Sequence, residues 1–123
     1  MKHIIFLEGD NELTFREYYD CFEKLGYKVD SITGLYDSIR KLSVLETKQP
    51  DTLFVSNGAE LSSERREELI EQFFLQSYRP KNIIFPSKSE LVKYKKPIKI
   101  LHQQGVKFFI YWLKHNSFEE ITP

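Results

Sequence analysis

The chain has 123 residues with 18 basic and 18 acidic side chains, so its formal net charge is zero. A neutral chain of this length is expected to fold as a single domain, residues 1–123, and its charge argues against a role in coating nucleic acid or an anionic membrane. The one cysteine, Cys21, excludes an internal disulfide and a cysteine-based zinc cluster. No apolar run is long enough for a membrane span and no signal-peptide pattern is present, so we expect a cytoplasmic protein.

Strand and helix patterns alternate along the chain. Short apolar runs rich in β-branched residues predict buried strands, and apolar stripes at helical spacing predict helices between them. The expected strands are Ile4–Leu7, Tyr27–Ile32, Thr52–Val55, Ile83–Phe85 and Val106–Leu113. The expected helices begin at Asn11, with Tyr18, Phe22 and Leu25 inward, at Leu35, at Ser62 or Ser63, and at Glu90, the last being disturbed at Pro97.

This (βα)₄β pattern predicts a doubly wound α/β fold. Parallel neighbours need crossover connections, so we expect a five-stranded parallel sheet with helices on both faces. Ligands of such folds bind at the carboxyl ends of the strands. The candidate site residues at those ends are Glu8, Gly9, Asp10, Ser56, Asn57, Ser87 and the segment from Trp112 to Lys114.

The basic residues are concentrated in one part of the chain. Nine of them lie between Arg79 and Lys114, where Glu90 is the lone acid. One side of the domain is therefore expected to be positive. The simpler interpretation of such a run is a solvated, lysine-rich surface.

The strand ends and their flanks resemble the receiver domain of two-component response regulators. The resemblance covers nearly the whole chain and is carried by the fragments IIFLEGDNEL (Ile4–Leu13), LGYKV (Leu25–Val29), PDTLFV (Pro50–Val55), GVKFFI (Gly105–Ile110) and SFEEI (Ser117–Ile121). It implies a flavodoxin-like fold in which an aspartate accepts a phosphoryl group. The family's site also has an acidic pair that holds Mg²⁺, a hydroxyl residue that contacts the phosphoryl group and a lysine that forms an ion pair with it. The cation and the lysine offset the charge on the transferring oxygens.

The sequence departs from the receiver pattern at several of these positions. Ser56 stands at the acceptor position, Gly9 removes one carboxylate from the acidic cluster, and the lysine position falls on Trp112 or on Lys114. A serine must be deprotonated before it can attack, and the motif around it contains no histidine to act as the base. The resemblance therefore implies a pseudo-receiver, whose degenerate phosphorylation pocket would comprise Glu8, Gly9, Asp10, Ser56, Asn57, Ser87 and Lys114.

We expect a non-catalytic, receiver-like signalling module that acts by docking to proteins, independently of phosphorylation. In receivers the fourth helix, fifth strand and fifth helix carry the output. The corresponding candidate interface here is Lys93, Lys95, Lys96, Lys99, Tyr111 and Trp112, which favours a partner with an acidic surface. Because neighbours in a strand point opposite ways, either Tyr111 or Trp112 is expected to be exposed.

The resemblance also implies a fifth helix beginning at Ser117–Ile121. The given sequence stops at Pro123, so we expect this helix to be short or missing, unless a following domain lies beyond it. A missing helix would leave apolar surface on the sheet and favour a homodimer or a bound partner.

The alternative hypothesis is a small phosphate- or nucleotide-binding protein or enzyme on a flavodoxin-like scaffold. It would use Asp10, Ser56, Asn57 and Ser87, but the first loop lacks the glycine-rich pattern that cradles phosphate. No cofactor is expected. Glu8 and Asp10 are weak candidates for a metal site, because two carboxylates supply few ligands for a hard cation.

Overall fold

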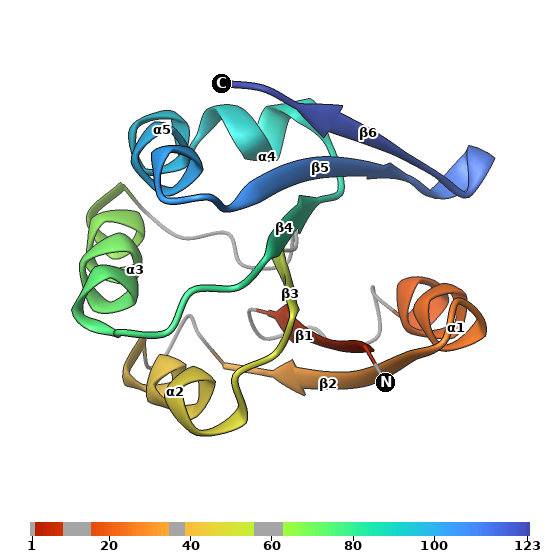
Figure 1. Ribbon diagram of the computed structural model, residues 1–123, viewed down its shortest axis with the longest axis horizontal. Coiled ribbons are helices and arrows are strands. Elements are labelled where there is room, and N and C mark those ends of the chain that lie inside the picture. Colours follow the sequence, from red (N-terminus) through yellow and green to blue (C-terminus); the bar gives the residue numbers. More distant parts are fainter. Residues whose placement is uncertain (1, 9–15, 35–38, 56–62) are drawn as a thin grey trace.

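The computed structural model describes residues 2–8, 16–34, 39–55 and 63–123, apart from some side chains of the helix at 63–75. In these ranges strands and helices alternate from the first strand to the fifth (Figure 1). The elements are β1 (Lys2–Leu7), α1 (Arg16–Lys24), β2 (Tyr27–Ile32), α2 (Val44–Lys48), β3 (Thr52–Val55), α3 (Ser63–Leu75), β4 (Asn82–Phe85), α4 (Lys88–Val92), α5 (Lys95–Gln103), β5 (Lys107–Trp112) and β6 (Ser117–Ile121).

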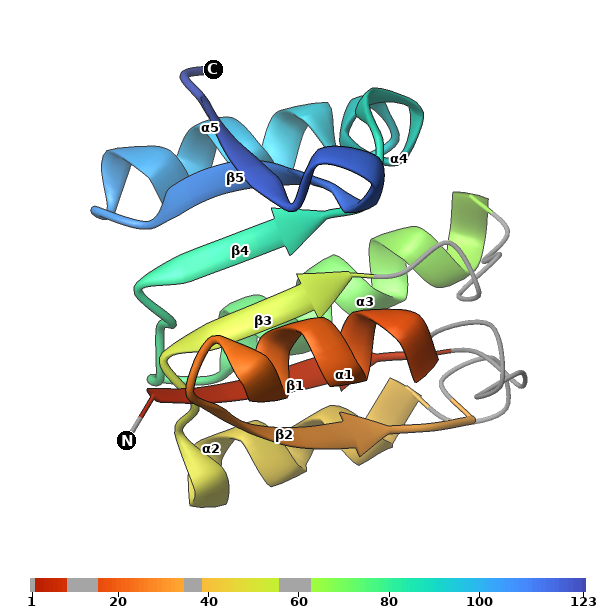
Figure 2. The ribbon, with the colours of Figure 1, turned by 90° about the vertical axis from the view of Figure 1, so that its right-hand side faces the viewer.

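The strands form one sheet in the order β2-β1-β3-β4-β5-β6. The first five strands pair in parallel, and β6 pairs with β5 in the antiparallel direction. Figure 2 shows the arrows of β2, β3 and β4 pointing the same way. The α/β class and the parallel pairing of five strands are therefore confirmed, and the sheet has one strand more than the sequence predicted.

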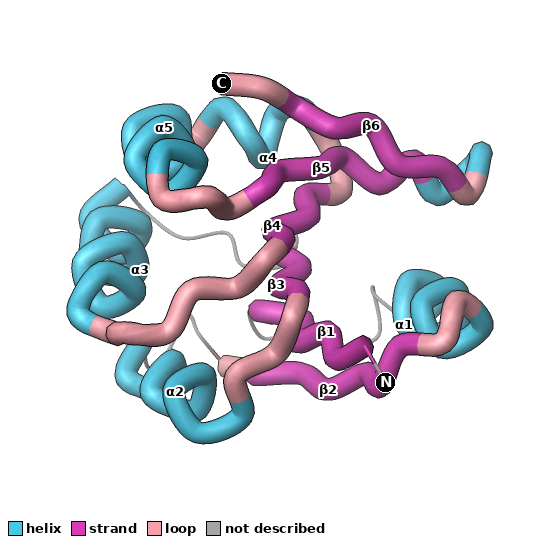
Figure 3. Tube along the Cα trace, in the orientation of Figure 1, coloured by secondary structure: helices cyan, strands magenta, loops and turns pink. Residues whose placement is uncertain are grey.

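Helices cover both faces of this sheet, but unequally. Figure 3 shows α2, α3, α4 and α5 on one side of the strands and α1 on the other. Consecutive residues of a strand point to opposite faces, so the apolar strands supply two separate cores. Ile5 and Leu53 pack in the core beneath α2, α3 and α5, whereas Phe6 and Phe54 pack beneath α1.

The innermost strands are buried on both faces. Ile4, Ile5 and Phe6 of β1 and Phe54 of β3 have no exposed surface, and Leu53 of β3 is 1% exposed. Their continuous apolar runs match what a parallel strand with covered faces requires. Not every apolar residue of the pattern is inside, because Leu25 at the end of α1, expected inward, is 45% exposed.

Helices begin and end at local sequence signals. Gly26 has a φ of +92° and its N–H donates to the Glu23 carbonyl at 3.0 Å, so it ends α1 in the left-handed conformation that favours glycine.

The expected helix at Glu90–Gln104 is two helices, α4 and α5. Pro97 is the third residue of α5, in the first turn, where a missing N–H costs no intrahelical hydrogen bond.

The segment Ser117–Ile121 is a strand and not the beginning of a fifth helix. After β5 the chain makes a 3₁₀ turn at Leu113–His115, and Asn116, with a φ of +46°, reverses it into β6. Phe118 then lies opposite Tyr111 in the antiparallel register, with ring centroids 5.0 Å apart. Extending the sheet buries part of the Phe118 ring against β5 in a way that a helix leaving the sheet at this point would not.

None of the helices in the described ranges combines the length and the hydropathy that crossing a lipid bilayer requires.

The reversal at Asn116 supplies a test of the β5–β6 hairpin. Its Oδ1 accepts a hydrogen bond of 2.6 Å from the hydroxyl of buried Tyr111. Asn116→Ala loses this bond and places a Cβ-bearing residue without local hydrogen bonding in the left-handed region, so we expect a loss of about 2 kcal/mol of unfolding free energy. Asn116→Gly loses only the bond and should cost about 1 kcal/mol. Urea denaturation measures both, and equal losses for the two variants would contradict the constraint at this turn.

Candidate functional site

The carboxyl ends of the parallel strands contain a buried acidic residue. Glu8 directly follows β1 and has no exposed surface, and its N–H donates to the Ile32 carbonyl at 2.9 Å. The hydroxyl of Tyr19 in α1 donates a hydrogen bond to Glu8 Oε1. One oxygen of this carboxyl therefore bonds a tyrosine from the covering helix, which ties α1 to the end of β1.

Ser87 lies where β4 gives way to α4, and its hydroxyl takes part in the local structure. Ser87 Oγ accepts from the Glu90 N–H at 3.4 Å as the N-cap of α4, and it lies 2.9 Å from Ser89 Oγ. N-capping is a common structural role of serine.

Lys114 occupies the 3₁₀ turn that follows β5. Its side chain is exposed, and it makes no ion pair with any residue that the structure describes. Glu8, Ser87 and Lys114 therefore follow three strands of one sheet, but no hydrogen bond or ion pair links Ser87 with Lys114. The remaining residues of the expected pocket, Gly9, Asp10, Ser56 and Asn57, lie outside the described residues.

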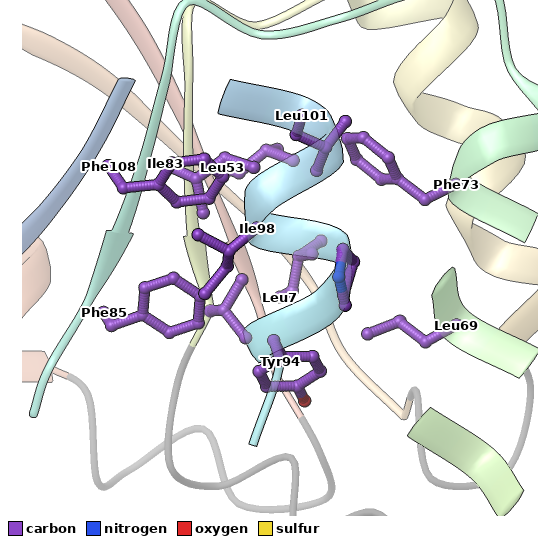
Figure 4. A pocket seen from close by; sticks show the side chains of 12 residues that line it. Leu7, Leu53, Leu69, Phe73, Ile83, Phe85, Tyr94, Ile98, Leu101 and Phe108 are labelled. Atoms are coloured by element: carbon purple, nitrogen blue, oxygen red, sulfur yellow. The ribbon is translucent and has the colours of Figure 1, made fainter. Parts of the chain in front are cut away.

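A small apolar cavity lies under the sheet face that carries α3 and α5. Its volume is about 60 Å³, and Figure 4 shows Leu7, Phe85, Ile98 and Phe108 pointing into the same space, with Tyr94 at its edge. Pockets for small ligands usually measure about 300 Å³ or more and contain a few polar groups. This cavity is a packing space in the core and not a site for a phosphate or a nucleotide.

The expected basic interface is present in part on α5 and the segment before it. Lys95, Lys96 and Lys99 are exposed, and none of them forms an ion pair with a carboxylate among the described residues. Lys93 differs, because its Nζ lies 2.8 Å from Glu90 Oε1 and its charge is partly compensated. Lys96, Lys99 and Ile100 share one face of α5 by their helical spacing.

Tyr111 is not part of this surface. Its ring is fully buried on the α1 side of the sheet, where Phe22 and Phe118 lie with centroids 5.1 and 5.0 Å away. Burial raises the pKa of its phenol, with the neighbouring Cys21 adding to the shift. The exposed member of the pair is Trp112, which retains 37% of its surface. The candidate interface therefore loses Tyr111 and keeps Trp112.

Sequence reasoning missed two apolar surface features. Val92 and Ile100, beside the exposed lysines in sequence, are 64% and 46% exposed. Their signal was available, since each interrupts a charged stretch at a position off the buried stripe of Ile98 and Leu101. The second feature is a groove of about 320 Å³ on the face that carries α1, lined by Lys2, Tyr27, Asn82, Ile84, Phe109 and Phe118, and called the α1-face groove below. Its residues come from five strands, so no local pattern in the sequence predicts it.

A charged cluster near the amino ends of the strands has a structural role. His3 Nε2 lies 2.6 Å from Asp30 Oδ2, and Lys48 Nζ lies 3.8 Å from the same oxygen. Burial raises the pKa of the Asp30 carboxyl, but the hydrogen bond from His3 and the charge of Lys48 outweigh it, so the pKa is lowered. The cluster connects β1, β2 and α2 at the end of the sheet opposite the candidate pocket.

A search of protein-family models and a search of curated proteins find no match for this sequence.

The buried Glu8–Tyr19 pair yields a prediction for the candidate pocket. Tyr19→Phe removes a donor from a fully buried carboxyl, so we expect it to lower the unfolding free energy by about 1–3 kcal/mol. In a Glu8→Gln background the same change should cost less, because the acceptor is then neutral. Chemical denaturation of the four proteins in this double-mutant cycle gives the coupling. A coupling of zero would mean that the charge of the carboxyl does not strengthen its hydrogen bond with the Tyr19 hydroxyl.

Proposed function

We propose that this chain is a receiver-like docking module without phosphotransfer activity. The strand order β2-β1-β3-β4-β5, with parallel pairing throughout, is the order of flavodoxin-like folds, to which receivers belong. This order supports the resemblance carried by the sequence fragments. Folds of this kind serve many activities, so we infer the function from the residues of the site and not from the fold.

The observation that carries the proposal is the residue that follows β3. In receivers the phospho-accepting aspartate stands there, and here β3 ends at Val55 and the next residue in the sequence is Ser56. A carboxylate attacks a phosphoryl group without first losing a proton, whereas a serine hydroxyl requires a base. The segment around it, PDTLFVSN, contains no histidine to act as that base. Loss of the acceptor therefore removes the reaction and leaves the scaffold.

Other parts of the pocket support the same interpretation. Glu8, the first acid of the cluster, is buried and bonded by Tyr19, so one of its oxygens is already engaged by the protein. Ser87, the candidate hydroxyl residue, caps α4. Both side chains have structural uses that need neither Mg²⁺ nor a phosphoryl group.

The second candidate function gains no support from the described cavity. A phosphate or nucleotide needs donors and positive charge close to its oxygens, and the 60 Å³ space between the sheet, α3 and α5 is lined by apolar side chains.

The docking surface that we propose is the exposed face of α5 with its neighbouring lysines. Lys95, Lys96 and Lys99 provide positive charge without a described counter-ion, and Ile100 adds exposed apolar area among them. Trp112 at the end of β5 offers an aromatic side chain of the kind that dominates binding energy at interfaces. Complementary charge accelerates and orients association, so the partner surface should be acidic.

The surface is tested by placing a photo-crosslinking amino acid at Lys99 in the native cells. We expect one protein to be captured repeatedly, and the double charge reversal Lys95→Glu/Lys96→Glu should lower its yield at least tenfold, because like charges then face the acidic partner. Thermal melting should be unchanged, since both lysines are exposed.

The matched control reverses two exposed lysines elsewhere, Lys24 on α1 and Lys28 on β2, with the crosslinker again at Lys99. This variant should retain the adduct. Equal loss in both double variants would point to net charge alone, and an adduct unaffected by Lys95→Glu/Lys96→Glu would rule out the proposed surface.

A further inference from the structure

The sheet face that carries α1 is covered over only part of its width. Phe22 of α1 packs on Phe6 and Phe54 of the inner strands, and Phe118 of β6 reaches back to Phe22, with ring centroids 5.9 Å apart. Among the elements that the structure describes, Figure 1 shows no second helix on this side next to β4 and β5. The α1-face groove lies here, between β1–β2 on one side and β6 on the other.

The groove has aromatic walls and an apolar floor. Tyr27 of β2 and Phe118 of β6 come from opposite sides, and Ile84 and Phe109 of the central strands lie between them. Ile84 is 2% exposed, whereas Phe118 retains 42% of its surface. The space of about 320 Å³ is five times that of the core cavity and opens to the surface, so it can accept large side chains from outside.

Positive charge borders the groove. The Lys2 ammonium lies 5.6 Å from the centroid of the Tyr27 ring, which forms the wall beside it. Lys107 faces the same side of the sheet, because Phe109 and Tyr111 follow it at intervals of two along β5. Neither lysine forms an ion pair with a described residue, although Glu120 lies opposite Phe109 in the register. Carboxylates of a ligand at this rim would pair with two lysines that have no ion-pair partner among the described residues.

A second copy of the chain does not fit this groove well. An isologous dimer sets the same patch of both subunits face to face, and a concave basic patch complements neither the shape nor the charge of its own copy. Pairing of two β6 edges is also disfavoured, because Glu119 is the middle residue of this five-residue strand and would come near the Glu119 of the other copy.

We propose that the α1-face groove binds an amphipathic helix of a partner protein, with a large apolar or aromatic anchor between Tyr27 and Phe118 and acidic residues facing Lys2 and Lys107. Sheet faces in α/β domains are covered by helices, and α1 is the one helix that the structure describes on this side. The site extends the docking role proposed above to a second surface, on the opposite face of the sheet from α5.

The test is selection from a displayed library of helical peptides about five turns long, using the intact chain as the target. We expect enriched peptides to carry apolar residues at helical spacing, one of them aromatic, together with Asp or Glu. Addition of one synthesised winner should shift the amide signals of Asn82, Ile84, Phe109 and Phe118. Lys2→Glu and Lys107→Glu should each weaken binding about tenfold without changing the melting temperature, since both side chains are exposed.

The matched control is Lys95→Glu/Lys96→Glu, which should leave affinity for these peptides unchanged. This separates the two surfaces, so the groove can fail while the α5 surface stands, and the reverse. Winners with basic residues, winners without helical spacing, or amide shifts confined to other parts of the chain would overturn the proposal. A dimer that dissociates on Phe109→Glu substitution, measured by sedimentation, would assign the groove to a second copy and also overturn it.

Discussion

The structure depends on a parallel sheet whose central strands must be covered on both faces. Ile4–Phe6 and Phe54 are fully buried, so each face needs its own layer of side chains. On one face α2, α3 and α5 provide that layer, and on the other α1 does so over the strands nearest to it. In the part of the chain that the structure describes, β6 extends the sheet beyond β5, and Phe118 of β6 forms one wall of the aromatic groove.

Much of the fold could be predicted from the sequence, because local patterns and tertiary packing agree for its inner elements. Thr52–Val55 is a strand at the predicted residues, and α3 begins at one of the two serines expected. The helix expected at Ser117–Ile121 was wrong because it came from the resemblance of SFEEI to the receiver pattern and not from an apolar stripe in the sequence. Cross-strand packing of Phe118 on Tyr111, which involves a different part of the chain, decides its conformation.

The candidate sites were less predictable than the fold for the same reason. Strand alternation predicts that Tyr111 and Trp112 point to opposite faces of the sheet. It does not predict which of the two is buried, because the burial of Tyr111 depends on its contacts with α1 and β6. The lysines of α5 could be identified from sequence, since exposed charge on a helix is a local property. The groove could not, because Lys2, Tyr27, Ile84 and Phe118 meet only when β1, β2, β4 and β6 occupy one sheet.

The proposed docking role requires that this scaffold works without accepting a phosphoryl group. The direct measurement is exposure of the labelled chain to acetyl phosphate, and separately to beryllofluoride, with Mg²⁺, followed by intact mass and two-dimensional amide spectra. We expect no added phosphoryl mass and no saturable shifts of amides at the ends of β1, β3 and β4. A stoichiometric mass increase, or beryllofluoride shifts that require Mg²⁺ and centre on these strand ends, would show that the pocket retains acceptor chemistry and would contradict the account.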